Sequence, residues 1–417
     1  MATIEDLPNE IIIIILSYSD ITIEDVINFR CICKRFQCAA KNNKFKELKL
    51  LQRWSSVKKF YDTQSNENEQ KESEENEGKD KKKLNFIEIG VNCMKELHNF
   101  IFQIIVKYYC DSDQYDLIDY AERFEYIFRK HFQDEFEKII NKPENIIKYY
   151  FFIDELKRMI TQSSGINNDQ NEKMIKMELF RYMRRSFLKE TSKRFDAKLC
   201  ENQLLEEAVT IEIQIAHPEK IVFYSCVQAS LDDITQKVRN RLREKHPNHL
   251  IFSITDETFS YWKNNTEMRD SFYNKEEELQ IWDALADIFD KLNFQLCKSE
   301  DKNVENLCID DVLKNKYGQH VILLIIYHSV ARRLGLKTII KPQGRYQFSM
   351  FWIPKTALRT GNLTYYEISF EQFPKFLPSK TRTPVQHYGR QTLGSMLETI
   401  KLMYCLRECF SSSTKTY

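Results

Sequence analysis

Residues 7–16 read LPNEIIIIIL, and residues 31–36 read CICKRF. Pro8 suits the start of a helix, because the backbone N–H that proline lacks would have no partner there. The apolar run that follows belongs to a segment of about fifty residues, which is too small to build a stable core alone. The segment has no disulfide pattern and no zinc-ligand spacing. We therefore expect a small helical module that needs a partner protein.

The composition is that of a folded, helix-rich protein. Hydrophobic residues make up 42% and aromatic residues 13% of the 417 residues, and this length predicts two or three domains. Glycine and proline, at nine each, are few, which favours helices. The 62 basic and 61 acidic residues nearly cancel, so we expect neither nucleic acid nor a membrane surface as a partner.

The eleven cysteines are scattered and contain no Cys-x-x-Cys pair. We expect them to be reduced and mostly buried, and we expect neither a metal nor a cofactor. The N-terminus is acidic, unlike that of a signal peptide, and the apolar run at residues 11–16 is too short to cross a bilayer. The sequence thus predicts a soluble protein of the cytoplasm, the nucleus or both.

The first half of the chain divides into three parts. The N-terminal module occupies residues 1–61. Residues 62–83 contain no large apolar side chain, which predicts a disordered, charged linker. Residues 84–205 show apolar residues at three- and four-residue steps, which predicts a helical region. Its aromatic stripe is expected to belong to the core, and comprises Phe124, Tyr126, Phe128, Phe132 and Phe136.

The last part, residues 206–417, has a different pattern. Residues 206–216 alternate like a strand but are flanked by helix formers, so both readings stay open. Ser230 is expected to cap the N-terminus of a helix. Residues 321–327 are apolar on all sides, which predicts a buried helix ending near Gly335. Strands are expected at residues 337–341, 346–353 and 363–369, and a last helix at 391–406. The predicted fold class is mostly α with an α+β C-terminal domain.

The N-terminal segment resembles an F-box, the helical module that binds the Skp adaptor of a cullin–RING ubiquitin ligase. The resemblance rests on the two motifs quoted above, including Lys34 and Arg35, and on an apolar helix face formed by Ile11, Ile15 and Leu16. The alternative is an ordinary helical hairpin of the main domain. The resemblance implies that the adaptor is contacted by Leu7, Pro8, Glu10, Ile11, Ile15, Leu16, Val26, Cys33 and Phe36.

A second resemblance lies near the other end of the chain. Residues 309–318 read IDDVLKNKYG and residues 327–336 read YHSVARRLGL, and both are similar to the SirB-type transglutaminase-core-like domain, which has a papain-like fold. With an F-box before it, the whole chain resembles the F-box only protein twenty-one family. That family is understood as a receptor that brings substrates to a Skp–cullin–F-box ligase for ubiquitination and degradation. Its usual C-terminal module, similar to hemimethylated-DNA-binding proteins, is expected to be absent here.

Active transglutaminase-core enzymes carry a cysteine at the start of the buried helix, and a histidine and an aspartate on the following strands. The matching positions of this chain are His320, Gln347 and Glu367. Neither a thiolate nor an imidazole base stands where the mechanism needs it. The resemblance therefore implies an inactive domain, a pseudoenzyme that binds a protein substrate through its cleft or through the helical region.

Two other functions remain open at this point. A cysteine hydrolase or transglutaminase could use Cys308 as its nucleophile, and labelling of that thiol by an electrophilic probe would reveal it. A scaffold that binds partners without degradation would bind the Skp adaptor but leave the half-lives of its partners unchanged.

Overall fold

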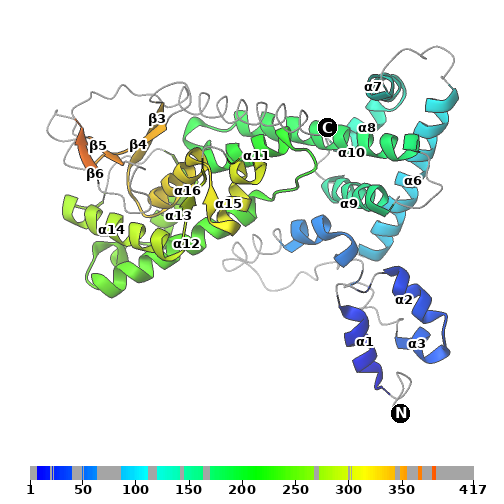
Figure 1. The fold of residues 1–417 in the computed structure, drawn as a ribbon, viewed down its shortest axis with the longest axis horizontal. Helices are drawn as coiled ribbons and strands as arrows, with labels where there is room; N and C mark the ends of the chain where they lie inside the picture. The colour runs from blue at the N-terminus through cyan, green and yellow to red at the C-terminus, as the bar shows by residue number, and fades with distance from the viewer. Residues whose placement is uncertain are drawn as a thin grey trace, which may run out of the picture. The chain divides into compact units, whose positions relative to one another are not determined.

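The computed structural model describes residues 7–18, 21, 23–39, 49, 51–62, 86–110, 120–140, 145–162, 170–266, 272–298, 301, 303–342, 348–354, 365–368 and 378–381. The chain forms two compact units, residues 1–187 and 188–417 (Figure 1). Of the predicted linker, only Asp62 falls within the described residues, and the predicted domain boundaries remain predictions. No described helix combines the length and the apolar content that a membrane crossing requires.

Three short helices form the N-terminal module: α1 (Asn9–Ser17), α2 (Ile23–Arg30) and α3 (Lys34–Ala39). Helix α1 begins directly after Pro8, whose carbonyl accepts hydrogen bonds from the backbone N–H groups of Ile11 and Ile12, both at 3.1 Å. Among the described residues, the buried core of the module consists of Ile12, Leu16 and Val26, and partly buried apolar side chains pack against it. A core of this size is small for an independent domain.

The rest of the first unit is helical, as predicted. It contains α6 (Phe86–Cys110), α7 (Tyr120–His131), α8 (Gln133–Ile140), α9 (Ile146–Gln162) and most of α10 (Gln170–Asp196). The predicted aromatic core is confirmed for the phenylalanines, since the rings of Phe128, Phe132 and Phe136 lie 5.4–6.2 Å from that of Phe100. It is wrong for Tyr126, which is 44% exposed. Tyr126 lies two residues from Phe128, and this spacing places it on the opposite side of α7.

A buried junction joins the segment after the F-box-like module to α9. Asp154 accepts hydrogen bonds from the N–H groups of Ser56 and Val57, at 2.8 and 3.3 Å, and so caps the helical residues 55–62. The Glu155 carboxylate binds Arg53 through two hydrogen bonds, at 2.8 and 3.1 Å. Burial opposes the ionisation of Glu155, but the hydrogen bonds from Arg53 and Arg158 outweigh it and lower its pKa.

The second unit begins with helices. They are α11 (Leu205–Ala216), α12 (Tyr224–Lys245), α13 (Asp256–Asn264) and α14 (Lys275–Lys291), with the short 3-10 helices η4 (Cys200–Asn202) and η5 (Leu250–Ser253). Residues 206–216, left open by the sequence, are thus helical. The expected N-cap at Ser230 is wrong, because α12 starts six residues earlier. Within α12 the Ser230 hydroxyl donates to the carbonyl of Cys226 at 3.0 Å instead.

Helix α16 (His320–Arg333) is the predicted buried helix, and it packs against α11, α12, α13 and α15 (Ile309–Asn315). It also packs against the first two strands of an antiparallel sheet, whose order is β3 (Thr338–Pro342), β4 (Phe348–Trp352), β5 (Tyr365–Ile368) and β6 (Pro378–Thr381). A short parallel pair, β1 (Gln295–Leu296) and β2 (Tyr317–Gly318), and the 3-10 helix η6 (Val304–Leu307) precede α16. The α+β prediction is confirmed, while the helix predicted at residues 391–406 lies outside the described residues.

Gly335 ends α16 under a double constraint. Its φ is +81°, and a Cβ atom added there would lie 2.6 Å from the ring of Trp262. We predict that Gly335→Ala destabilises the second unit by about 2–4 kcal/mol, because the alanine must adopt a left-handed conformation and displace a buried ring. Urea unfolding followed by tryptophan fluorescence measures this loss.

The matched control is Asn293→Gly. Asn293 also has a positive φ, of 57°, so glycine relieves backbone strain there and should leave the stability nearly unchanged. Equal stability of the wild-type and Gly335→Ala proteins would contradict this account of the end of α16.

Candidate functional site

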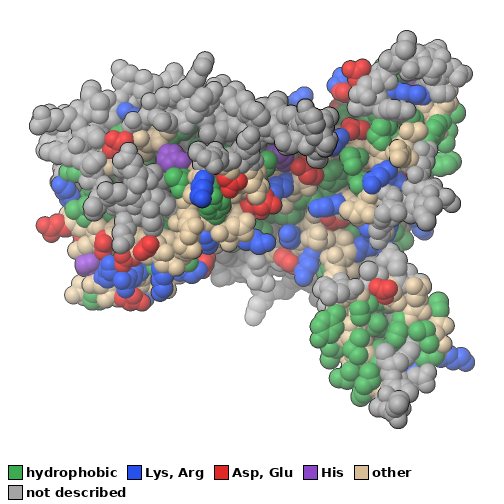
Figure 2. All heavy atoms as spheres, viewed as in Figure 1, with side chains coloured by type: hydrophobic (Ala, Val, Ile, Leu, Met, Phe, Trp, Pro, Cys, Tyr) green, Lys and Arg blue, Asp and Glu red, His purple; other side chains and the backbone are tan. Residues whose placement is uncertain are grey.

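The N-terminal module presents an exposed apolar stripe along α1. Ile11 and Ile14 are 40% and 54% exposed, and their spacing of three residues places them on one face of the helix; Tyr18, the residue directly after the helix, is 64% exposed. Ile12 and Leu16, on the other face, are buried in the core of the module. Figure 2 shows hydrophobic side chains gathered on the surface of this module. We call Ile11, Ile14 and Tyr18 the α1 stripe.

The two quoted motifs meet at the start of α1. The guanidinium of Arg35, in α3, donates to the backbone carbonyl of Leu7, and its Nε donates to Oδ1 of Asn9 at 3.2 Å. Leu7 and Cys33 also pack against the edge of the module core. The spacing between the motifs is therefore the length of chain needed to fold α3 back onto the first turn of α1.

The structure sorts the predicted adaptor-binding residues into three groups. Pro8, Glu10 and Ile11 are exposed, and Leu7, Ile15 and Cys33 are half-buried. Leu16 and Val26 are only 4% and 8% exposed and belong to the core of the module, and their contact with an adaptor stays a prediction. The side chain of Phe36 lies outside the described part of the chain. Sequence reasoning missed Ile14 and Tyr18, because five consecutive isoleucines leave no polar position that would show which face is buried.

Two residues that follow α3 in the chain, Lys49 and Gln52, bind the backbone at and just after the end of α1. The buried ammonium of Lys49 donates to the backbone carbonyls of Tyr18 and Ile21, at 2.6 and 2.8 Å. Burial lowers its pKa, and Asp25 acts in the opposite direction. Gln52 donates to the carbonyl of Ser17 at 2.9 Å. These bonds satisfy carbonyl groups at the end of α1 and leave the α1 stripe uncovered.

The three degenerate catalytic positions were predicted on α16 and on the strands that follow it. His320 is the first residue of α16, as predicted, and burial lowers the pKa of its imidazole. Glu367 lies in β5, paired with Phe351 of β4 and Ser379 of β6. Gln347 lies outside the described residues. The start of the buried helix thus carries an imidazole, while the equivalence of His320 with the nucleophile position of an active enzyme stays a prediction.

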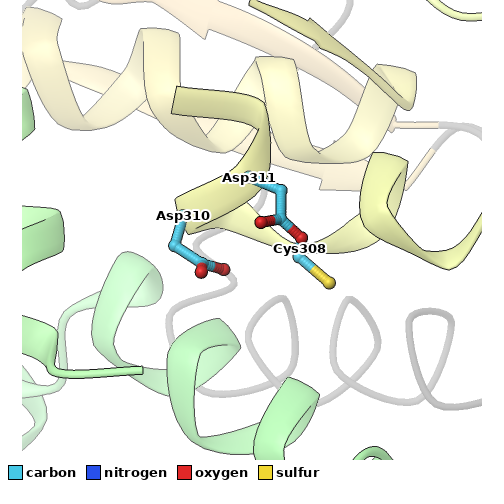
Figure 3. A group of neighbouring side chains, drawn as sticks. All are labelled: Cys308, Asp310 and Asp311. Carbon is cyan, nitrogen blue, oxygen red and sulfur yellow. The ribbon is translucent and has the colours of Figure 1, made fainter. Parts of the chain in front are cut away.

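Cys308, the other candidate nucleophile, is fully buried at the start of α15, and its thiol lies 3.4 Å from the carbonyl of Val304. Burial raises the pKa of this thiol to about 12, although the neighbouring Lys220 acts in the opposite direction. Its side chain lies beside those of Asp310 and Asp311, within 4.8 Å (Figure 3). The ammonium of Lys220 pairs with Asp311 and lies 3.7 Å from Asp310, so an ion-pair cluster occupies this place.

The Arg332-Arg333 motif of α16 forms a buried charge cluster with Glu206 of α11. Arg333 binds Glu206 at 2.8 Å and Asp232 at 3.0 Å, and Ser329 donates to Glu206 at 2.9 Å. Burial alone would raise the pKa of Glu206, but the two arginines outweigh it and lower that pKa to about 2.

Arg332 also carries hydrogen bonds beyond the carboxylate. It binds Glu206 and donates to the backbone carbonyls of Trp262, Lys263 and Asn265 at the end of α13. The motif therefore holds α11, α13 and α16 together, which assigns its arginines to the fold rather than to catalysis.

Comparison with protein families finds a match for two parts of the chain. Residues 4–48 match the F-box domain, and residues 226–340 match the transglutaminase-like superfamily. The chain therefore contains an F-box and, after it, a transglutaminase-like domain, as the sequence predicted. The comparison with curated proteins found no significant match, and neither did the comparison with solved structures. The narrower resemblance to the F-box only protein twenty-one family stays a prediction.

The burial of Cys308 predicts low thiol reactivity. We expect iodoacetamide to modify native Cys308 at least about a hundredfold more slowly than the exposed Cys226, because little thiolate forms at neutral pH. Peptide mass spectrometry after timed labelling measures both rates. Labelling in guanidinium is the control and should equalise them, whereas native Cys308 reacting as fast as Cys226 would favour the cysteine enzyme.

Proposed function

We propose that this protein is a substrate-recognition subunit of a Skp–cullin–F-box ubiquitin ligase. The observation that carries the proposal is the α1 stripe, an exposed apolar surface on a module whose sequence matches the F-box domain. An exposed apolar helix face of this kind fits a groove on a partner, and here the partner is the Skp adaptor, which connects the receptor to the cullin. Such a receptor works in the cytoplasm or the nucleus.

The contribution of the protein to ubiquitination would be proximity rather than chemistry. The F-box tethers it to the ligase, and the transglutaminase-like domain or the helical region holds a protein substrate near the ubiquitin donor. Two observations support an inactive transglutaminase-like domain: His320 replaces the nucleophile, and the thiol of Cys308 is buried with a raised pKa. We retain the division into residues 1–61, 62–83, 84–205 and 206–417 as part of this proposal.

The proposal predicts that charge on the α1 stripe abolishes adaptor binding. The double variant Ile11→Asp, Ile14→Asp should lose at least about 3 kcal/mol of binding free energy, because two carboxylates would have to be desolvated in the interface. Affinity purification scored for the Skp adaptor and the cullin gives the first readout, and calorimetry with the purified adaptor gives the free energy. Both side chains are exposed, so the variant should fold.

Phe102→Asp is the matched control, since it places a carboxylate at a 66% exposed apolar residue of α6 in the same unit. This variant should retain both ligase subunits. Recovery of the adaptor with the Ile11→Asp, Ile14→Asp protein would exclude the α1 stripe as the docking surface. Loss of the adaptor from both this variant and Phe102→Asp would exclude it as well, because the effect would then not be specific to the stripe.

A further inference from the structure

Helix α12 carries two arginines whose guanidinium groups lie over aromatic rings. Arg239 and Arg243 are four residues apart and therefore lie on one face of the helix. The Cζ atom of Arg239 lies 4.2 Å from the ring centroid of Phe259 in α13, and that of Arg243 lies 4.7 Å from the ring of Phe252 in η5. Stacking on a ring orients a guanidinium but leaves the N–H groups at its edge able to donate.

The described part of the chain gives neither guanidinium an ion pair or a hydrogen bond. The Nε atom of Arg239 is buried and has no acceptor. Burial lowers the pKa of Arg239, the charge of Arg243 lowers it further, and Asp256 only partly offsets both without forming an ion pair. Two like charges therefore lie side by side, and no described residue offers them an acceptor.

The neighbouring cations of the same helix show the contrast. Arg241 pairs with Asp287 at 3.0 Å and with Glu244 at 3.1 Å, and Lys245 pairs with Asp283 at 2.7 Å. The cations of α12 that face α14 are thus neutralised within the domain, whereas Arg239 and Arg243, beside η5 and α13, have no ion pair among the described residues. On the face beside η5 and α13, no described residue supplies an acceptor, so the edges of the two guanidinium groups can bind an anionic group of another molecule.

The geometry favours a phosphoryl group as this acceptor. It carries a charge of about −1.5 to −2 and three acceptor oxygens, which matches two guanidinium groups, whereas a single carboxylate would leave one arginine without a counter-charge. Leu250, in the same 3-10 helix as Phe252, is 40% exposed and offers an apolar contact beside the charged pair. A charged pair next to an apolar contact fits a side chain on a peptide better than a free ion.

We propose that Arg239 and Arg243 form a recognition site for a phosphorylated serine of a partner protein. The use of this site to hold a substrate rests on the receptor function proposed above, whereas phosphopeptide binding itself does not. A failure of adaptor binding and a failure of phosphopeptide binding are therefore separate results.

The test is a binding assay of the full chain on a peptide array in which every sequence appears with serine, phosphoserine and glutamate at its centre. Fluorescence polarisation then gives the affinities of the best binders. We expect a subset of sequences to bind only as phosphopeptides, and Arg243→Gln or Arg239→Gln to weaken them by about tenfold or more. Arg243 is exposed, so its variant should fold even if Arg239→Gln does not.

Arg241→Gln is the matched control, because it removes the same charge from the same helix at a position whose partners lie within the domain. It should change the affinity by less than about twofold. An equal loss of phosphopeptide affinity with Arg241→Gln would show that the effect is general electrostatic attraction, and it would overturn the proposed site. Equal binding of phosphoserine, glutamate and serine peptides, or binding of none, would overturn it as well.

Discussion

Glu206 of α11 accepts hydrogen bonds from Ser329, Arg332 and Arg333, all of α16, inside the second unit. Taking these charges out of water costs several kcal/mol per ion, and the cost is offset only when every partner is in place. The cluster also reaches Asp232 of α12 and the backbone at the end of α13. The position of the buried helix, and with it the position of His320 and of the sheet, depends on this one carboxylate.

In the N-terminal module, apolar side chains rather than buried charges determine how the helices are held. The described core of the module covers the face of α1 that carries Ile12 and Leu16, while Ile11 and Ile14 on the opposite face stay in contact with solvent. Hydrogen bonds from Arg35 and Lys49 to backbone carbonyls fix the ends of the helix without covering that face. The face of α1 that the described core leaves exposed is the surface that the proposed adaptor would bind.

The sequence correctly predicted those features that are determined by residues close together along the chain. The apolar run in α16, the glycine after it and the positions of the motifs were all found in this way. Features were left open or missed where burial on all sides or an apolar run hides the periodic signal: residues 208–214 of α11 are buried without exception, and residues 11–15 of α1 are all isoleucine although one face of that helix is exposed. Ser230 was misplaced because a serine before acidic residues also fits the interior of a helix, where its hydroxyl bonds the preceding turn.

The candidate sites likewise include positions that local sequence predicts and contacts that join distant parts of the chain. The place of His320 at the start of α16 follows from its distance to the Arg332-Arg333 motif along a single helix. The pairing of those arginines with Glu206 joins residues more than a hundred positions apart, and no local pattern announces it. The stacking of Arg239 and Arg243 on rings from η5 and α13 is equally non-local, since it depends on how three elements fold together.

Hydrogen exchange of the full-length Glu206→Gln protein tests most directly whether this carboxylate holds the second unit together. Loss of the charge leaves two buried arginines uncompensated, so exchange protection in α11, α13 and α16 should fall by about 3–5 kcal/mol. Protection in α6 and α9 of the first unit should not change. Wild-type protection throughout α16 in the Glu206→Gln protein would contradict the central role of the charge cluster.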